Sequence, residues 1–242
     1  MATDCTNCPL RRKEAFVDMS DDEAQYMKRF KVGELKVEAD TPILSEGSNA
    51  PQLYTVLRGM GVRYKLTRDG RRQVINFVFP GDFLGLQAGV MKEMGHSVDS
   101  VTPMTLCVFD RSKIWQLFRD KPERAFDLTW LASVEEHFLG ESLLTIGQRD
   151  AMGAISWALA RIAQRGHALD LITNGAMPFR FRQQDLADAL GLSLVHTNKT
   201  LRRLREQQIV TWSEGRLHIH DPEKLGEMGG VDIFTPVARP LI

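Results

Sequence analysis

The chain has 242 residues, of which 43% are hydrophobic and 26% charged, which is ordinary for a globular protein and enough for two modest domains. The formal net charge is zero, which excludes attraction of the protein as a whole to nucleic acid. No apolar run approaches a membrane span, no signal-peptide core is present, and three cysteines are too few for a disulfide framework. We therefore expect a cytoplasmic protein that does not bind membranes.

The first part of the chain predicts a short arm, residues 1–19, followed by a β-rich domain, residues 20–119. Ser20 is suited to cap a helix that runs to about Phe30. Short alternating strands come next, separated by turn signals such as Asp69-Gly70. We predict strands at residues 35–37, 42–44, 53–57, 62–66, 74–79 and 106–109. Many short strands with regular turns are typical of a β-sandwich or jelly roll.

A long amphipathic helix is predicted over residues 120–148, opened by Pro122 and broken at Gly147. Its apolar face repeats at spacings of three and four and contains Phe126, Trp130, Val134, His137, Phe138 and Leu144. A face carrying Trp and Phe needs a partner surface. That surface is either the preceding β domain or a second copy of the chain.

Residues 149–225 predict a winged helix-turn-helix domain. A helix over Ala151–Gln164 leads into two shorter ones, Gln183–Leu190 and about Leu194–Gln207, separated by a turn at Gly191. The second of these places apolar residues on one side and Val195, Lys199 and Arg202 on the other. Two alternating stretches, 209–212 and 216–220, then form a hairpin wing. The alternative is a solvated helix pair of no function, but a basic helix followed by a wing favours DNA binding and, with it, a two-fold dimer through the long helix.

The order of these parts resembles the Crp/Fnr family of bacterial transcription regulators. The residues that carry the likeness are Gly47, Gly59, the run from Gly81 to Gly85 (GDFLG) and the run from Asp185 to Ser193 (DLADALGLS). The resemblance implies an α+β protein with an N-terminal β-roll sensor domain, a dimerisation helix and a DNA-binding domain. It implies a homodimeric, sequence-specific regulator, not an enzyme, whose partners are a palindromic double-stranded operator and RNA polymerase. The rival interpretation is a sensor that acts mainly through protein–protein contact.

The effector pocket departs from the nucleotide-binding members of this family. Those members resemble one another in a Gly-Glu pair for ribose and an Arg-Ser pair for the cyclic phosphate. The matching positions here are Gly85-Leu86 and His96-Ser97. Leucine accepts no hydrogen bond and histidine is a weaker anion partner than a guanidinium. We expect the pocket to lack the phosphate fork and not to bind cyclic AMP, so the chain resembles Fnr and FixK proteins more than the cyclic AMP receptor.

The recognition helix also departs from the family's pattern of a Glu near its start and an Arg four residues later, since Val195 and Lys199 stand there. The familiar operator sequence is therefore not transferable. The residues left to read bases are Val195, His196, Asn198 and Lys199. Those better placed for phosphates are Arg182, Gln184, Ser193, Arg202 and Arg203.

Cys5, Cys8 and Cys107 resemble in position the cysteines with which oxygen-sensing relatives hold an iron–sulfur cluster. A cluster normally takes four ligands, and the family's remaining N-terminal cysteine falls near Glu14 here. Three alternatives stay open: a cluster, a thiol redox or metal role, or no function, with Cys107 a buried strand residue and the other two on a mobile arm. The favoured expectation is no cofactor. The tail, residues 226–242, is expected to be irregular and is given no role.

Overall fold

The computed structural model describes residues 2–242, which divide into two compact units. The first contains residues 2–12, 16–135 and 239–242, and the second contains residues 13–15 and 136–238. The long helix α4 (Pro122–Gln148) belongs to both, because the division falls after Glu135. Within residues 2–242, no helix combines the length and the apolar character needed to cross a membrane.

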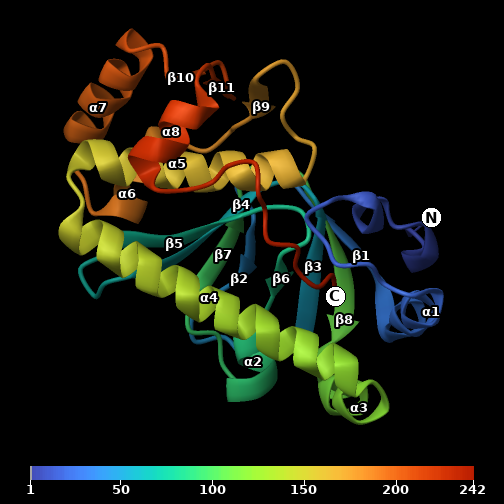
Figure 1. Ribbon diagram of the computed structural model, residues 1–242. Coiled ribbons are helices and arrows are strands. Elements are labelled where there is room, and N and C mark those ends of the chain that lie inside the picture. The colour runs from blue at the N-terminus through green and yellow to red at the C-terminus, as the bar shows by residue number, and fades with distance from the viewer. Residues whose placement is uncertain (1) are drawn as a thin grey trace. The chain divides into compact units, whose positions relative to one another are not determined.

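The first unit is built on two four-stranded antiparallel sheets (Figure 1). One has the strand order β1-β8-β3-β6 and the other β2-β7-β4-β5, so strands far apart in the sequence lie side by side. The strands are β1 (Lys31–Val37), β2 (Pro42–Leu44), β3 (Gln52–Arg58), β4 (Gly61–Leu66), β5 (Arg72–Val78), β6 (Phe83–Leu84), β7 (Ser97–Ser100) and β8 (Met104–Asp110). Val56, Val98 and Leu106 are fully buried members of one apolar core.

Helices and turns surround these sheets. The first is α1 (Asp21–Phe30), which begins with a full capping box, since Ser20 and Glu23 satisfy each other's backbone N–H groups. The other elements of this unit are the 3₁₀ turns η1 (Cys5–Asn7), η2 (Pro9–Arg12) and η3 (Arg111–Lys113) and the helices α2 (Leu86–Met91) and α3 (Ile114–Asp120). The fold class predicted from the sequence is confirmed, with antiparallel sheets followed by a long helix.

Two parts of this unit differ from the sequence prediction. Strand β1 begins at Lys31 rather than at residue 35, because its ladder with β8 continues as far as the pair Lys31 and Phe109. The alternation of apolar side chains in β1 is weak, so only the partner strand defines its length. The region between β5 and β8, for which no element was predicted, holds β6, α2 and β7.

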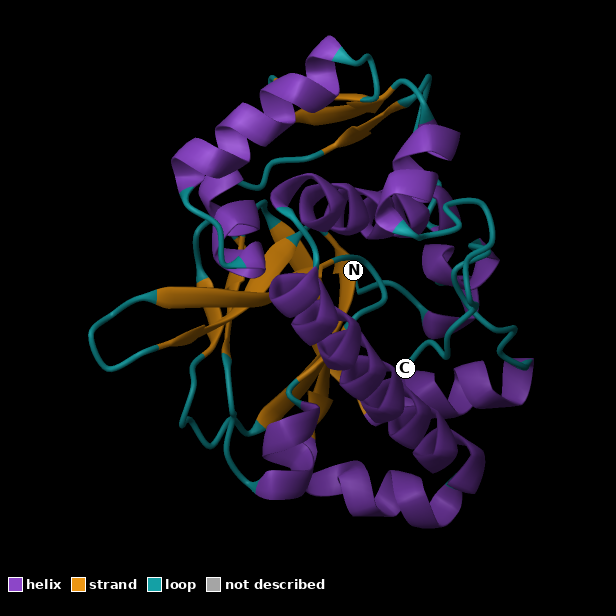
Figure 2. Ribbon diagram, turned by 60° about the vertical axis from the view of Figure 1, so that its left-hand side comes forward, coloured by secondary structure: helices purple, strands orange, loops and turns teal. Residues whose placement is uncertain are grey.

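The second unit joins helices to a small antiparallel sheet of order β10-β11-β9 (Figure 2). Its elements are the C-terminal part of α4, α5 (Ala151–Ala168), β9 (Ala176–Pro178), α6 (Gln183–Leu190), α7 (Leu194–Glu206), β10 (Val210–Ser213), β11 (Arg216–Ile219) and α8 (Pro222–Gly229). The predicted helix-turn-helix and hairpin wing are present, with β9 as a third strand.

The prediction of an irregular tail after residue 226 is wrong in part, because α8 continues to Gly229. Asp221 caps this helix, proline occupies its first turn, and Gly230 ends it in the left-handed conformation with φ 65°. The signals were present in the sequence, but eight residues with three glycines around their end make a weak helical pattern. The last four residues are also not free, since they pack within the first unit.

Candidate nucleic-acid interface and sensor pocket

The turn between α6 and α7 is set by local chemistry. Gly191 adopts φ 65°, which ends α6, and the Ser193 hydroxyl accepts a hydrogen bond from the backbone N–H of His196 at 3.2 Å, which starts α7. Thr197, Leu201 and Leu204 are buried, so one face of α7 is fixed against the rest of the unit. The opposite face is therefore held outward by packing.

The four predicted base-reading residues share this outward face. Val195 is 80% exposed, and His196, Asn198 and Lys199 are also exposed. They occupy the first two turns of α7, and the N-terminal residues of a recognition helix are those that contact base edges in the major groove. The structure thus groups the apolar side chain of Val195 with an amide, an imidazole and an ammonium group.

Most of the predicted phosphate contacts are engaged within the chain. Arg202 pairs with Glu206 at 2.8 Å through exposed side chains, and the exposed Arg182 contacts the buried carboxylate of Asp185 at 3.1 Å. The Gln184 amide donates to Asp188 at 2.5 Å, the Ser193 hydroxyl caps α7, and Arg203 is exposed. An exposed ion pair contributes little free energy, so Arg202 can exchange its carboxylate for a phosphate at small cost, whereas Arg182 would leave a buried carboxylate behind.

The wing adds a cation that sequence reasoning missed. The turn between β10 and β11 has positive φ at both central residues, Glu214 and Gly215, as a two-residue hairpin turn requires. A Cβ atom added at Gly215 would lie only 2.8 Å from the Cδ atom of Arg180. This short distance places the exposed side chain of Arg180 beside the tip of the wing. Its position depends on the pairing of β9 with β11, which the sequence did not reveal.

In the first unit, the predicted effector positions lie around β6, α2 and β7. Gly85 is buried with φ 91° and precedes α2, and Leu86 is the first residue of that helix. The Ser97 hydroxyl accepts a hydrogen bond from the backbone N–H of Glu46 at 3.0 Å. Burial, and then the nearby charge of Arg63, lower the pKa of His96 to about 4. His96 is therefore neutral at pH 7 and cannot replace a cationic phosphate partner.

Arg63, on β4, corrects the expectation that this region has no guanidinium. The residue is only 7% exposed, and its Nη1 atom forms an ion pair with Glu135 of α4 at 2.9 Å. Its Nη2 atom donates to the carbonyl of Phe83 at 3.0 Å, and Asn76 donates to Glu135 at 3.4 Å. The guanidinium is thus already neutralised. Sequence patterns could not reveal this burial, because an arginine in a strand ordinarily faces solvent.

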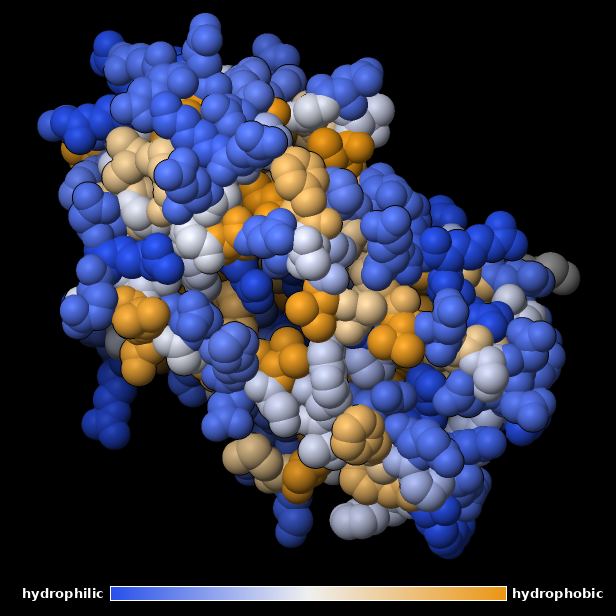
Figure 3. All heavy atoms as spheres, viewed as in Figure 1, coloured by the Kyte–Doolittle hydropathy of each residue, from blue (hydrophilic) through white to orange (hydrophobic). Residues whose placement is uncertain are grey.

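Only part of the predicted dimer face of α4 is exposed in the structure. Phe126, His137 and Leu144 are exposed, while Trp130 and Val134 are partly covered. Phe138 stacks on Trp157 with ring centroids 5.8 Å apart, within the second unit. Three further apolar residues of α4, missed by the sequence pattern, are exposed: Leu139, Leu143 and Ile146. Figure 3 shows hydrophobic side chains at the surface where Figure 1 draws this helix.

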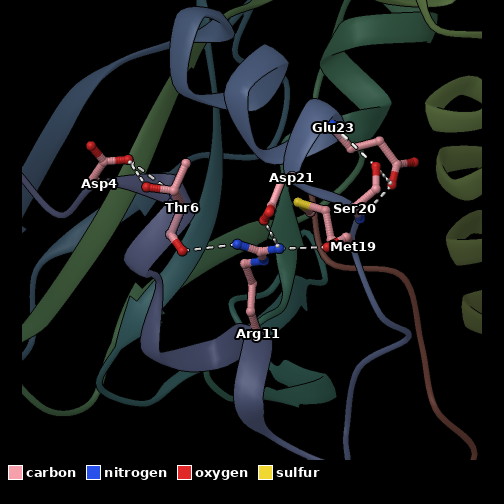
Figure 4. A network of polar contacts seen from close by, with 7 residues as sticks. All are labelled: Asp4, Thr6, Arg11, Met19, Ser20, Asp21 and Glu23. Atoms are coloured by element: carbon pink, nitrogen blue, oxygen red, sulfur yellow. Dashed lines mark hydrogen bonds and ion pairs between the residues drawn. The ribbon is translucent and has the colours of Figure 1, made fainter.

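The three cysteines line one pocket of the first unit, with Cys5 in η1, Cys8 after it and Cys107 in β8. The arm is held by polar contacts rather than free (Figure 4). Arg11 donates to the carbonyls of Thr6 at 2.9 Å and Met19 at 2.5 Å. The family resemblance had grouped these three cysteines, but no local sequence pattern could do so, because Cys107 is about a hundred residues from the other two.

The donor set does not fit a four-ligand iron–sulfur cluster. Three thiols line the pocket, and Glu14 is not among its lining residues. In the described part of the chain, residues 2–242, no three His, Cys, Asp or Glu side chains are arranged to hold a metal ion.

Both units match known protein families. Residues 34–121 match the family described as Cyclic nucleotide-binding domain, and residues 155–228 match the Crp-like helix-turn-helix domain. The nitrogen fixation regulation protein FixK of Rhizobium meliloti is 30% identical over 188 residues, which are 76% of this chain and 81% of that protein. The transcriptional activatory protein AadR of Rhodopseudomonas palustris is 28% identical over 182 residues, or 75% of each chain. The structure of FixK2 from Bradyrhizobium japonicum aligns with a TM-score of 0.73 at 24% identity, covering 81% of this chain and 96% of that one.

Proposed function

The chain belongs to the Crp/Fnr family of DNA-binding transcription regulators, which are not enzymes, and from that premise we propose that it acts as a cytoplasmic homodimer on a palindromic operator. Each copy inserts α7 into the major groove, with Val195, His196, Asn198 and Lys199 facing the bases. The observation that carries the proposal is the outward, polar N-terminal half of α7, fixed by the burial of its other face.

The dimer forms through α4. The exposed apolar residues Phe126, Leu139, Leu143 and Leu144 lie on a helix of 27 residues, and such a face is stabilised when a second copy covers it. Because α4 continues from the roll into the DNA-binding unit, a packing change in the roll passes along it to the recognition helix. Contact with RNA polymerase completes the regulatory role.

The signal is not cyclic AMP. Leu86 offers no acceptor for a ribose hydroxyl, and His96 carries no charge at neutral pH because its pKa lies near 4. Arg63, the buried guanidinium of this region, is paired with Glu135 and Phe83. A cyclic nucleotide would have to break those contacts to gain a partner for its phosphate.

A test begins with selection of bound duplexes from a random double-stranded pool, followed by titration of the selected operator at several salt concentrations. A palindromic consensus and a salt-dependent, nanomolar affinity are expected for specific binding. Lys199→Ala should relax one base position, whereas Lys224→Ala, an exposed lysine on α8, serves as the matched control. Failure to enrich any sequence would favour the rival role, a sensor that works mainly through protein–protein contact.

A thiol-based signal is the second candidate, because Cys5, Cys8 and Cys107 line one pocket of the roll domain. The proposal includes no bound cofactor, since three thiols do not complete a cluster site. The absorbance spectrum of protein purified without oxygen, together with iron and sulfide assays, distinguishes the two. Stoichiometric iron and sulfide would contradict this proposal and would indicate an oxygen-sensing or redox-sensing protein that holds an iron–sulfur cluster.

A further inference from the structure

The last four residues of the chain, 239–242, are packed within the roll unit. Pro240, Leu241 and Ile242 are buried, Leu241 to 5% exposure, whereas Val237, only four residues earlier, is 76% exposed. The contrast shows a change from solvent to interior within one short stretch of irregular backbone. We call residues 239–242 the docked tail.

Four polar contacts fix the docked tail to different elements of the roll unit. Its carbonyls at residues 239, 241 and 242 accept from the backbone N–H of Val17 at 3.0 Å, from Arg124 at 3.1 Å and from the Thr55 hydroxyl at 2.5 Å. Arg239 forms an ion pair with Asp82 at 2.9 Å. Asp82 is 2% exposed, and a carboxylate so deeply buried is costly unless it is paired. The tail therefore completes the interior of this unit.

The docked tail also forms a wall of the three-cysteine pocket. Leu241 and Ile242 line it together with Cys5, Cys8 and Cys107, and the remaining lining residues are mostly apolar. Every lining residue belongs to the roll unit. Burial raises the pKa of Cys107 to about 11 and raises that of Cys5 as well. These two thiols are thus kept protonated, the form that reacts slowly with electrophiles.

We propose that the docked tail is a plug, and that its seating and the attachment of a small apolar electrophile to the pocket thiols exclude each other. Such an electrophile, an α,β-unsaturated carbonyl compound, adds to a thiol without a further reactant. The sulfur–carbon bond forms as the carbon–carbon double bond breaks, and the thiol proton passes to the neighbouring carbon. Residues 230–238 join the plug to α8, so its release would free the C-terminal end of the DNA-binding domain.

The first experiment measures how fast N-ethylmaleimide modifies each cysteine of the full chain, read by mass spectrometry of the digested protein. Leu241→Asp places a charge in an apolar pocket, so the plug should open more often and the rate at Cys107 should rise by about tenfold or more. The matched control Val237→Asp adds the same charge at an exposed position and should leave the rate as in the wild type. Equal rates in all three proteins would overturn the proposal, as would equal acceleration by both variants.

A second, milder substitution at position 241 tests the same plug. If Leu241→Asp does not fold, Leu241→Ser should still raise the rate of modification at Cys107 by about threefold or more, and an unchanged rate in the folded serine variant would overturn the plug.

The reciprocal measurement uses wild-type protein modified with N-ethylmaleimide. Because coupling is mutual, the N–H of Val17, which donates to the tail, should exchange with deuterium faster after modification. Complete modification of Cys107 with unchanged protection of Val17 would refute mutual exclusion. Neither assay contains DNA, so its outcome is independent of the function proposed above.

Discussion

His96 gives the roll domain a sensitivity to mild acid that can be measured. Burial, followed by the charge of Arg63, lowers the pKa of the ring from 6.5 to about 4, and the partly opposing charges of Glu135 and Glu46 do not offset this. The unfolded chain takes up a proton near pH 6.5, but the folded protein does so only near pH 4. Because the folded-state pKa is depressed, the stability due to the neutral ring is present above pH 6.5 and is lost as the pH falls to 4.

The size of this loss follows from the two pKa values. Between pH 7 and pH 5 the free energy of unfolding should fall by about 2 kcal/mol through His96 alone, and by about 3 kcal/mol at pH 4. His96→Gln removes the titrating ring, so urea unfolding followed by tryptophan fluorescence should show a pH 7 to pH 5 difference smaller by about 2 kcal/mol. His196→Gln, at an exposed position on α7 in the other unit, is the matched control for replacing a histidine by glutamine. If His96→Gln and the wild type lose stability in parallel over this range, the assignment of His96 as a half-buried, neutral ring is refuted.

Four further predictions concern DNA, assembly and ligand. Lys199→Ala should weaken operator binding by roughly 1–3 kcal/mol and relax one base position, and unchanged affinity in a titration would remove Lys199 from the groove. Arg203→Ala should weaken binding to all sequences and flatten the salt dependence, whereas a sequence-selective loss would make it a base contact. Leu143→Glu charges an exposed α4 side chain, so sedimentation should show a folded monomer, and a stable mutant dimer would place the interface elsewhere. Calorimetry with micromolar cyclic AMP or cyclic GMP should show no binding, since two lost charge-assisted contacts cost about 3 kcal/mol or more, which is about a hundredfold in affinity; measurable binding would mean that Arg63 leaves Glu135 for the phosphate.

Local patterns in the sequence determined the helix-turn-helix and the hairpin wing of the DNA-binding domain. Gly191 and Ser193 locate the turn, because a left-handed backbone position and an N-cap are requirements of one or two residues. The spacing of Thr197, Leu201 and Leu204 is enough to assign the buried side of α7, and hence its outward side. The family resemblance rested on such local runs together with their order, and the family is confirmed.

Only the tertiary structure decided which distant residues meet. The pairing of Arg63 with Glu135 and the seating of Arg239 on Asp82 join positions 72 and 157 residues apart in the chain, and no periodicity encodes such pairs. The same holds for the position of the docked tail against the pocket lined by Cys5, Cys8 and Cys107. From the sequence, the exposure and reactivity of a charged or thiol side chain can be judged only from the residues next to it in the chain. Its burial, and with it its pKa and its reactivity, depends on what the folded chain packs over it.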